Sequence, residues 1–282
     1  MRLARIGDVG RERPAVLLDG EAVLVDDLVD DWDPETIASG GPQRVRDYEL
    51  GSRPRIPLEA IRLGAPVARP TKVVCVGLNY AKHAAETGAP APDEPIVFMK
   101  APNCVVGPND DIVLPPGSVT TDYEVELAVV LGARALYLPN VEAASSRILG
   151  YTVSQDISER NWQMERGGQW VKGKSFPTFN PLGPAIVTPD EWAYPNARVS
   201  CSVNGAARQD STTSDMIFSV NYIIWYISQF MELLPGDVVN TGTPSGVALG
   251  RSAEAYLSPG QRIRSSIEGL GEMTSFIVQH DG

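Results

Sequence analysis

Short runs of β-branched and other apolar residues, separated by glycine and proline, recur along the chain from Lys72 onward. A chain interrupted so often does not form long helices, and the pattern is typical of strands joined by turns. The close spacing of the runs favours a β-roll or barrel over alternating β-α units. We therefore expect a mixed β fold with some helix. The clearest runs are 72–77, 96–99, 126–131, 150–153, 199–203 and 237–241.

One later segment has helical spacing instead. Between Asp215 and Leu234 apolar residues recur near the period of an α-helix, and Pro235 and Gly236 follow. The pattern predicts a helix over 215–234 that ends at this Pro-Gly pair.

A proline-rich stretch at 63–70 interrupts both helix and strand patterns and predicts a domain boundary. Before it, residues 15–25 form two apolar runs around Asp19-Gly20, a strong hairpin signal. We expect residues 1–69 to form a small N-terminal β-rich domain and residues 70–282 to form the domain that carries the chemistry.

The charge balance limits the partners of the chain. It has 24 Lys and Arg against 35 Asp and Glu, a net charge of −11. Nucleic acids and anionic membranes need a basic face, so we expect neither as a partner. No apolar run reaches the roughly 18 residues of a membrane span, and charges near Met1 replace the apolar run of a secretory signal. With only three cysteines in no metal-type spacing, these features favour a cytoplasmic protein.

Acidic residues alternate at the start of the run that ends at Leu131. In a strand, Asp122, Glu124 and Glu126 point the same way, about 7 Å apart. Carboxylates that enter a buried strand either have raised pKa values or hold a cation. Oxygen ligands without nearby Cys or His favour Mg²⁺, Mn²⁺ or Ca²⁺ over zinc. An exposed acidic strand edge is the alternative interpretation.

Asp156 ends another strand-like run, at 150–156. An Asp in that place is more often a cap or turn residue. As a third carboxylate near Glu124 and Glu126, it would complete a site with open positions for substrate or water.

A possible base lies in the segment 79–86. His83 and Glu86 are three residues apart and are neighbours on one face of a helix. A carboxylate orients an imidazole and raises its basicity, which suits the activation of water. A surface pair on a short helix is the alternative.

Two glycine-containing loops are candidates for binding an anion. The loop 167–176 carries Lys172 and Lys174, and 240–247 follows a strand with Gly242 and Thr243. Exposed backbone N–H groups beside a hydroxyl suit a carboxylate. Ordinary solvated turns would also explain both loops.

Taken together, these motifs resemble those of the fumarylacetoacetate hydrolase superfamily. The matching pieces stand in the family's order and span about residues 70–250. The loop 165–175 is most similar to the bacterial branch that cleaves acylpyruvates and 2,4-diketo-3-deoxy sugar acids. The pieces are 76–80 with His83 and Glu86, then 98–100, 122–126, 155–157, 173–175 and 234–247.

The resemblance implies a β-roll core, a homodimer and a divalent cation, Mg²⁺ or Mn²⁺ with Ca²⁺ as a substitute. It places this cation on Glu124, Glu126 and Asp156. It implies a small 2-oxo or 2,4-dioxo acid as substrate, with His83 and Glu86 on a lid helix. The residues expected near the substrate are Lys174, Lys100, Gly242, Thr243 and Arg160.

The implied reaction is metal-dependent hydrolysis of a C–C bond in a 2,4-dioxo acid, which gives pyruvate or a related 2-oxo acid and a carboxylate. Three alternatives stay open. They are decarboxylation of oxaloacetate, isomerisation or hydration of a 2-oxo-enoic acid, and binding of a 2-oxo acid without catalysis.

Overall fold

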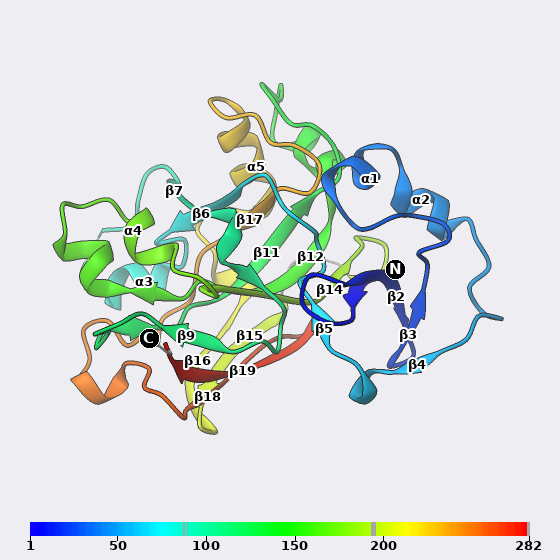
Figure 1. The fold of residues 1–282 in the computed structure, drawn as a ribbon. Coiled ribbons are helices and arrows are strands. Elements are labelled where there is room, and N and C mark those ends of the chain that lie inside the picture. The colour runs from blue at the N-terminus through cyan, green and yellow to red at the C-terminus, as the bar shows by residue number, and fades with distance from the viewer. Residues whose placement is uncertain (87, 89, 193–195, 281–282) are drawn as a thin grey trace.

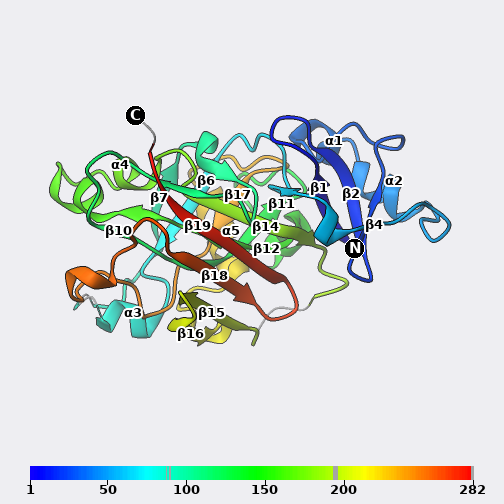
Figure 2. The same ribbon diagram turned by 60° about the horizontal axis from the view of Figure 1, so that its bottom comes forward.

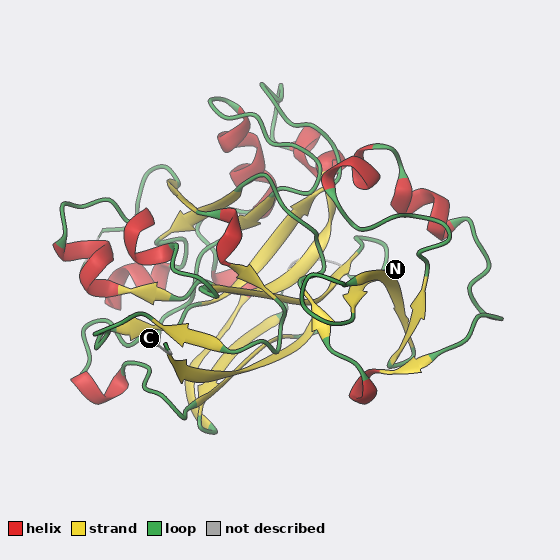
Figure 3. Ribbon diagram, viewed as in Figure 1, coloured by secondary structure: helices red, strands yellow, loops and turns green. Residues whose placement is uncertain are grey.

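The computed structural model describes the chain except residues 87, 89, 193–195, 281 and 282 (Figure 1). Over the described residues, the strands form sheets of twelve, five and two strands. The helices are short and lie around the margins of these sheets (Figure 3). The expected mixed, sheet-dominated fold is therefore confirmed.

The largest sheet follows the order β4-β3-β2-β1-β14-β12-β11-β17-β6-β7, with β5 beside β1 and β8 beside β14. Most neighbours are antiparallel, whereas β17 runs parallel to β6 and β8 parallel to β14. Strands β4 and β7 are the two ends of this order, so the sheet does not close into a barrel. The strands are β1 (Arg2–Ile6), β2 (Arg13–Leu18), β3 (Glu21–Leu24), β4 (Ile56–Pro57), β5 (Leu63–Gly64), β6 (Val73–Gly77), β7 (Ile96–Lys100), β8 (Val105–Val106), β11 (Val125–Leu131), β12 (Ile148–Gln155), β14 (Asn180–Val187) and β17 (Val238–Asn240).

The central strand β11 is buried on both faces. Leu127 and Val129 enter the main core, whereas Ala128 and Val130 enter a second cluster with Trp32. This alternation is the period of two that a strand imposes. The strand thus gives the region before it a rigid, buried support.

The five-stranded sheet packs against the same core and runs in the order β16-β15-β18-β19-β9. Figure 2 shows β15, β16, β18 and β19 together on one side of the molecule. A two-stranded sheet pairs β10 with β13. These strands are β9 (Ile112–Leu114), β10 (Thr121–Asp122), β13 (Ser158–Glu159), β15 (Arg198–Val203), β16 (Ala206–Thr212), β18 (Arg262–Ile267) and β19 (Gly271–Gln279).

The helical elements are single turns or a few turns. Two of them, α3 and α4, lie at the end of the molecule away from the N-terminal strands in both ribbon views (Figures 1 and 2). No helix among the described residues has the length and apolar character of a membrane span. The elements are α1 (Pro34–Ala38), α2 (Gly41–Arg46), α3 (Ala81–Glu86), α4 (Val171–Lys174), α5 (Val220–Ser228), the 3₁₀ turns η1 (Leu58–Ala60), η2 (Pro102–Cys104), η3 (Glu142–Arg147), η5 (Thr213–Asp215) and η6 (Ala253–Ala255), and the π turn η4 (Asn161–Glu165).

The helix predicted over 215–234 is wrong in its extent, because α5 covers only Val220–Ser228. The chain before α5 is not helical, because Thr213–Asp215 form the 3₁₀ turn η5 and Met216 is extended. The N–H groups of Ile217 and Phe218 donate to Asn79 and hold this segment beside it. The Ser219 side chain then caps the helix by accepting from the Tyr222 N–H. After Gln229 the chain turns.

The N-terminal hairpin is confirmed. Asp19 and Gly20 have φ of 53° and 82° between β2 and β3, as a two-residue turn of this kind requires. Strand β1 pairs with β14, so the N-terminal strands continue the large sheet. The division of the chain near residue 70 stays a prediction.

Candidate active site

Three carboxylates meet where β11 begins and β12 ends. Glu124 precedes β11, Glu126 lies on it, and Asp156 follows β12. The two strands are antiparallel neighbours, and the Asp156 N–H donates to the Glu124 carbonyl. The three side chains are buried, and each offers an oxygen within 4.8 Å of the others. The structure therefore brings together the predicted acidic set.

Strict alternation along one strand predicted that Asp122 points the same way as Glu124 and Glu126, and this prediction is wrong. The strand pairing is interrupted between β10, which ends at Asp122, and β11. The Asp122 carboxylate instead accepts hydrogen bonds from the N–H groups of Tyr123, Ala248 and Leu249 and from Arg160. It ties the loop after β17 to this end of the sheet.

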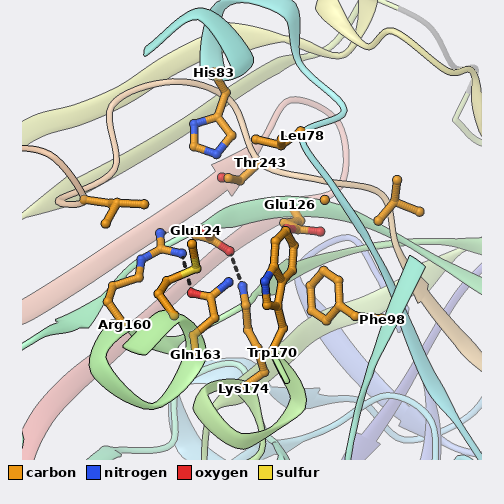
Figure 4. A pocket seen from close by; sticks show the side chains of 14 residues that line it. Leu78, His83, Phe98, Glu124, Glu126, Arg160, Gln163, Trp170, Lys174 and Thr243 are labelled. Carbon is orange, nitrogen blue, oxygen red and sulfur yellow. Dashed lines mark hydrogen bonds and ion pairs between the residues drawn. The ribbon is translucent and has the colours of Figure 1, made fainter. Parts of the chain in front are cut away.

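Buried cations separate the carboxylates. Lys174 Nζ lies 2.5 Å from Glu124 Oε2 (Figure 4). It also lies 2.7 Å from Asp156 Oδ2. Arg160 Nη2 lies 2.6 Å from Glu124 Oε1 and also contacts Asp122. Burial opposes the charge of Lys174, yet Asp156 and Glu124 outweigh it and raise the lysine pKa.

Glu126 has a different environment from Glu124. Burial alone would raise the pKa of Glu124, but Arg160 and Lys174 outweigh it and hold that pKa below its usual range. For Glu126, burial and then the charges of Asp156 and Glu124 raise the pKa well above its usual range. Its carboxylate accepts from the Gly242 N–H at 2.7 Å. Glu126 is thus the member of the set that a cation would stabilise most.

The donor set fits a divalent cation. Three carboxylates that each offer an oxygen, with no thiolate or imidazole among them, match the preference of Mg²⁺, Mn²⁺ and Ca²⁺. The raised pKa of Glu126 marks negative charge that the neighbouring side chains do not balance. A divalent ion would supply that balance.

A cavity of about 210 Å³ opens beside the carboxylates (Figure 4). Its polar lining residues are His83, Glu124, Glu126, Arg160, Gln163, Lys174 and Thr243. Its apolar lining residues are Val76, Leu78, Phe98, Met164, Trp170 and Leu249, and the Lys174 Nζ lies 5.0 Å from the centre of the Phe98 ring.

His83 lies on α3, on the opposite side of the cavity from Lys174 (Figure 4). Its Nδ1 is 3.4 Å from Glu86 Oε2, and Glu86 accepts from the Gly246 N–H at 2.9 Å. His83 is only 5% exposed. Glu86 therefore fixes the orientation of a buried His83 at the cavity, and the two residues are not a surface pair.

Thr243 and Gly242 lie where the loop after β17 passes the carboxylates. Thr243 lines the cavity, and its hydroxyl donates to the Val125 carbonyl and accepts from Gln209 Nε2. Gly242 contacts Glu126 through its N–H.

Lys100 lies behind the carboxylates and outside the cavity wall. Its Nζ is 2.5 Å from Asp156 Oδ1 and donates to the carbonyls of Ile157 and Phe179. The structure thus gives Lys100 a contact that holds Asp156 in place. Lys172, the other lysine of the loop 167–176, is exposed.

The sequence did not place the apolar lining residues or Gln163 at the cavity. Gln163 Oε1 accepts from Arg160 Nη1 at 2.9 Å within the π turn η4. The three-residue spacing of Arg160 and Gln163 is a signal for such a pair only if a turn is already known there. Phe98 and Trp170 belong to segments far apart in the chain and meet only in the folded protein.

Comparison with known proteins shows the family to which the chain belongs. The family described as fumarylacetoacetate (FAA) hydrolase, C-terminal, matches residues 72–278. The chain belongs to this family, as its motifs predicted. Its named relatives include hydrolases, isomerases and an oxaloacetate tautomerase.

Three relatives are informative. The mitochondrial oxaloacetate tautomerase of Bos taurus is 47% identical over 227 residues, which are 80% of this chain and 72% of that protein. Fumarylacetoacetate hydrolase from Exiguobacterium antarcticum is 34% identical with a TM-score of 0.86, over 99% of this chain and 100% of that chain. Maleylpyruvate hydrolase from a Sphingobium species, solved with manganese(II) and pyruvate, is 29% identical with a TM-score of 0.82 over 100% of both chains.

Proposed function

We propose that the protein is a divalent-metal-dependent hydrolase that cleaves a C–C bond of a 2,4-dioxo acid. The products are pyruvate, or a related 2-oxo acid, and a carboxylate. The observation that carries this proposal is that His83, whose Nδ1 contacts Glu86, faces the buried Glu124 and Glu126 across one cavity. A base on one side and a cation site on the other are what such a hydrolysis needs.

Glu124, Glu126 and Asp156 would hold the cation, for which we propose Mg²⁺ or Mn²⁺, with Ca²⁺ as a substitute. When bound, such an ion supplies a Lewis acid for the oxygens of a 2-oxo acid. The manganese and pyruvate in the Sphingobium relative support this assignment.

His83 would act as the general base. Glu86 faces Nδ1 and orients the ring, which leaves the other ring nitrogen for proton transfer. That nitrogen takes a proton from water, and the resulting hydroxide attacks the distal carbonyl carbon. The bond between this carbon and the carbon that joins it to the 2-oxo acid group then breaks. The attacked carbon becomes a carboxylic acid, which ionises to the carboxylate product, and the 2-oxo acid fragment is the leaving group.

The electron pair of the broken bond stays with the 2-oxo acid fragment, which then takes up a proton. Lys174 lines the cavity with its charge already fixed by Glu124 and Asp156. A preorganised positive charge stabilises negative charge that develops beside it. Thr243 and its loop would contact the substrate carboxylate.

The test is incubation of the purified protein with Mg²⁺ and acetylpyruvate, followed by proton NMR. We expect acetate and pyruvate in equal amounts, and no products when EDTA is present. Persistence of turnover after complete removal of divalent ions would contradict the metal requirement. An absence of turnover across several acylpyruvates would contradict the hydrolase.

Oxaloacetate tautomerisation is the second candidate, favoured by the 47% identity to the Bos taurus tautomerase. In that reaction His83 would take a proton from the carbon next to the oxo group instead of from water. The same NMR experiment with oxaloacetate in D₂O separates the two. Faster keto–enol interconversion without pyruvate would support the tautomerase, and release of carbon dioxide with pyruvate would indicate decarboxylation.

We also propose a homodimer in the cytoplasm. The three cysteines are free and buried, which is common in reducing compartments. Phe230, after α5, leaves 55% of its side chain exposed and is a candidate interface residue. Light scattering during size-exclusion chromatography tests the dimer.

A further inference from the structure

The chain turns sharply just before the helix that carries His83. Leu78, Asn79 and Tyr80 connect the end of β6 to the start of α3. Leu78 has a φ of 54°, in the left-handed region that is unfavourable for a leucine. A backbone of this kind persists only where the surrounding contacts hold it. The direction in which α3 leaves the sheet therefore depends on what holds this turn.

Asn79 ties the turn to two other segments of the chain. Its side chain is fully buried, and its Nδ2 donates to the Thr241 carbonyl at 2.7 Å and to the Phe218 carbonyl at 3.1 Å. Its Oδ1 accepts from the Phe218 N–H at 2.7 Å, and its own carbonyl accepts from the Ile217 N–H. One side chain thus joins the start of α3, the loop after β17 and the segment before α5.

The same tie leads to the carboxylates. Gly242 follows Thr241, and its N–H donates to Glu126 at 2.7 Å. A Cβ added at Gly242 would lie 2.7 Å from the Asn79 Cβ, so the loop packs directly against Asn79. The loop therefore contacts Asn79 on one side and the candidate cation ligand Glu126 on the other. Asn79 sets where the helix of His83 lies relative to Glu126.

A second tie lies at the other end of α3. Glu86 accepts from the Gly246 N–H, which belongs to the same loop after β17. A short helix that is tied at both ends has a fixed direction as well as a fixed position. If the contacts of Asn79 were lost, only the tie through Glu86 would remain, and α3 could pivot about it.

We propose that Asn79 is a positioning residue, which holds the His83 ring at its working place opposite the carboxylates. The role of His83 as the base rests on the proposed function, whereas the placement of its ring is measured without any reaction. Asn79 is not among the described residues that line the cavity, so it acts through α3 and the loop after β17. Its effect on catalysis is then an effect on His83.

The first test is kinetic. Asn79→Ala should lower kcat by about 10²-fold, because a small misplacement of a catalytic group has an effect of this size. KM and Mg²⁺ affinity should change little, since Glu126 is held on β11. In a protein that already carries H83A, the same change should cost little more, because the group that Asn79 positions is gone. Fully additive losses in the double variant would overturn the proposal.

The second test needs no substrate. The sequence contains two histidines, His83 and His280, so protein with ¹³C-labelled histidine gives two ring signals in NMR. The H83A spectrum assigns them. In N79A we expect the His83 signal to shift or broaden and the exposed His280 signal to stay. An unchanged His83 signal in folded N79A would overturn the proposal. A protein that hydrolyses no acylpyruvate but shows the His83 change would refute the proposed reaction and leave this inference standing.

Two further variants separate positioning from general destabilisation. Ser228→Ala is the matched control, because Ser228 is also fully buried and accepts the N–H of Leu138 from a distant segment. S228A should lower Tm but leave kcat and both histidine signals unchanged. An S228A protein that loses as much activity as N79A would overturn the proposal.

Asn79→Asp keeps the shape of the side chain and the acceptor for the Phe218 N–H, but it removes the donor to the two carbonyls. We expect N79D to change the His83 signal as N79A does. Thermal melts establish that each variant is folded. Loss of folding in both Asn79 variants would overturn the proposal, because Asn79 would then serve the fold as a whole.

Discussion

Lys174 and Glu124 form an ion pair at the cavity, with 2.5 Å between Nζ and Oε2, and both side chains are almost completely buried. The same ammonium lies 2.7 Å from Asp156. It therefore stands between two carboxylates that would otherwise repel each other. The lysine has a structural role in addition to the catalytic one that we propose.

Lys174→Met should both destabilise the protein and slow it. Removing one partner of a buried pair leaves uncompensated charge and costs about 3–5 kcal/mol. Loss of a preorganised charge should lower kcat/KM by about 10²-fold or more. Denaturant unfolding and steady-state kinetics measure the two effects. Lys172→Met is the matched control, because Lys172 is exposed in the same loop. A K174M protein as stable as the control would contradict the structural role.

His83→Ala should lower the rate by about 10²–10⁴-fold, the usual contribution of a general base. Binding of Mg²⁺, followed by calorimetry, should stay intact because His83 lies across the cavity from the carboxylates. His280→Ala is the control, since His280 is exposed near the end of the chain. Full activity in H83A would remove the base from the mechanism.

Glu86→Gln tests the orientation of that base. It keeps a hydrogen-bonding group beside His83 Nδ1 but removes the charge, so the rate should fall by less than in H83A. In a protein that already carries H83A, the same change should cost little, because the two residues act as one unit. Additive losses in the double variant would show that Glu86 acts independently of His83.

The acidic set could be predicted because Glu124 and Glu126 are two residues apart at the start of a strand. A strand places such residues on the same face. Glu126 lies on β11 and Glu124 directly before it, and the two side chains reach the same site. The same argument is wrong for Asp122, because the strand is interrupted between Asp122 and Val125. Arg160 and the backbone of the loop after β17 hold the Asp122 side chain instead. Nothing in the local pattern marks that interruption.

Tertiary contacts also explain the other differences. The helix α5 begins late because Met216 is extended and the N–H groups of Ile217 and Phe218 donate to Asn79, which is distant in the chain. The spacing of apolar residues along the chain does not reveal such contacts with a distant segment. The contact between Phe98 and Trp170 could not be predicted for a similar reason, since the packing of α4 against β7 brings these two rings together.

Glu126→Gln should abolish the response to divalent ions while the protein stays folded. Glutamine keeps the shape of the side chain and removes the negative charge that a cation would balance. In the unchanged protein, Mg²⁺ at 100 times its Kd should stabilise the fold by about 2.7 kcal/mol and raise Tm. Thermal melts with and without Mg²⁺ or Mn²⁺ measure this shift. Glu232→Gln, at an exposed site, is the control and should keep it. An E126Q protein with a full metal-dependent shift in Tm would show that Glu126 is not a ligand.

Glu12→Gln should lower stability in a way that depends on pH. Glu12 contacts Arg5 and Arg62 in the N-terminal region. Burial would raise its pKa, but a backbone hydrogen bond, Arg62 and Arg5 together hold the pKa below its ordinary value of 4.5. The folded state therefore favours the ionised form. The stability from this carboxylate is present above the unfolded-state pKa and is lost as the pH falls through the lower folded-state pKa.

At about pH 7 the E12Q variant should be less stable by about 1–3 kcal/mol, the usual contribution of hydrogen bonds to a charged group. The difference should shrink as the pH falls below the unfolded-state pKa, because the unchanged protein then loses the charge as well. Urea unfolding across this range measures it, with Glu49→Gln at an exposed position as the control. A difference that stayed constant down to acid pH would mean that shape rather than charge at Glu12 stabilises this region.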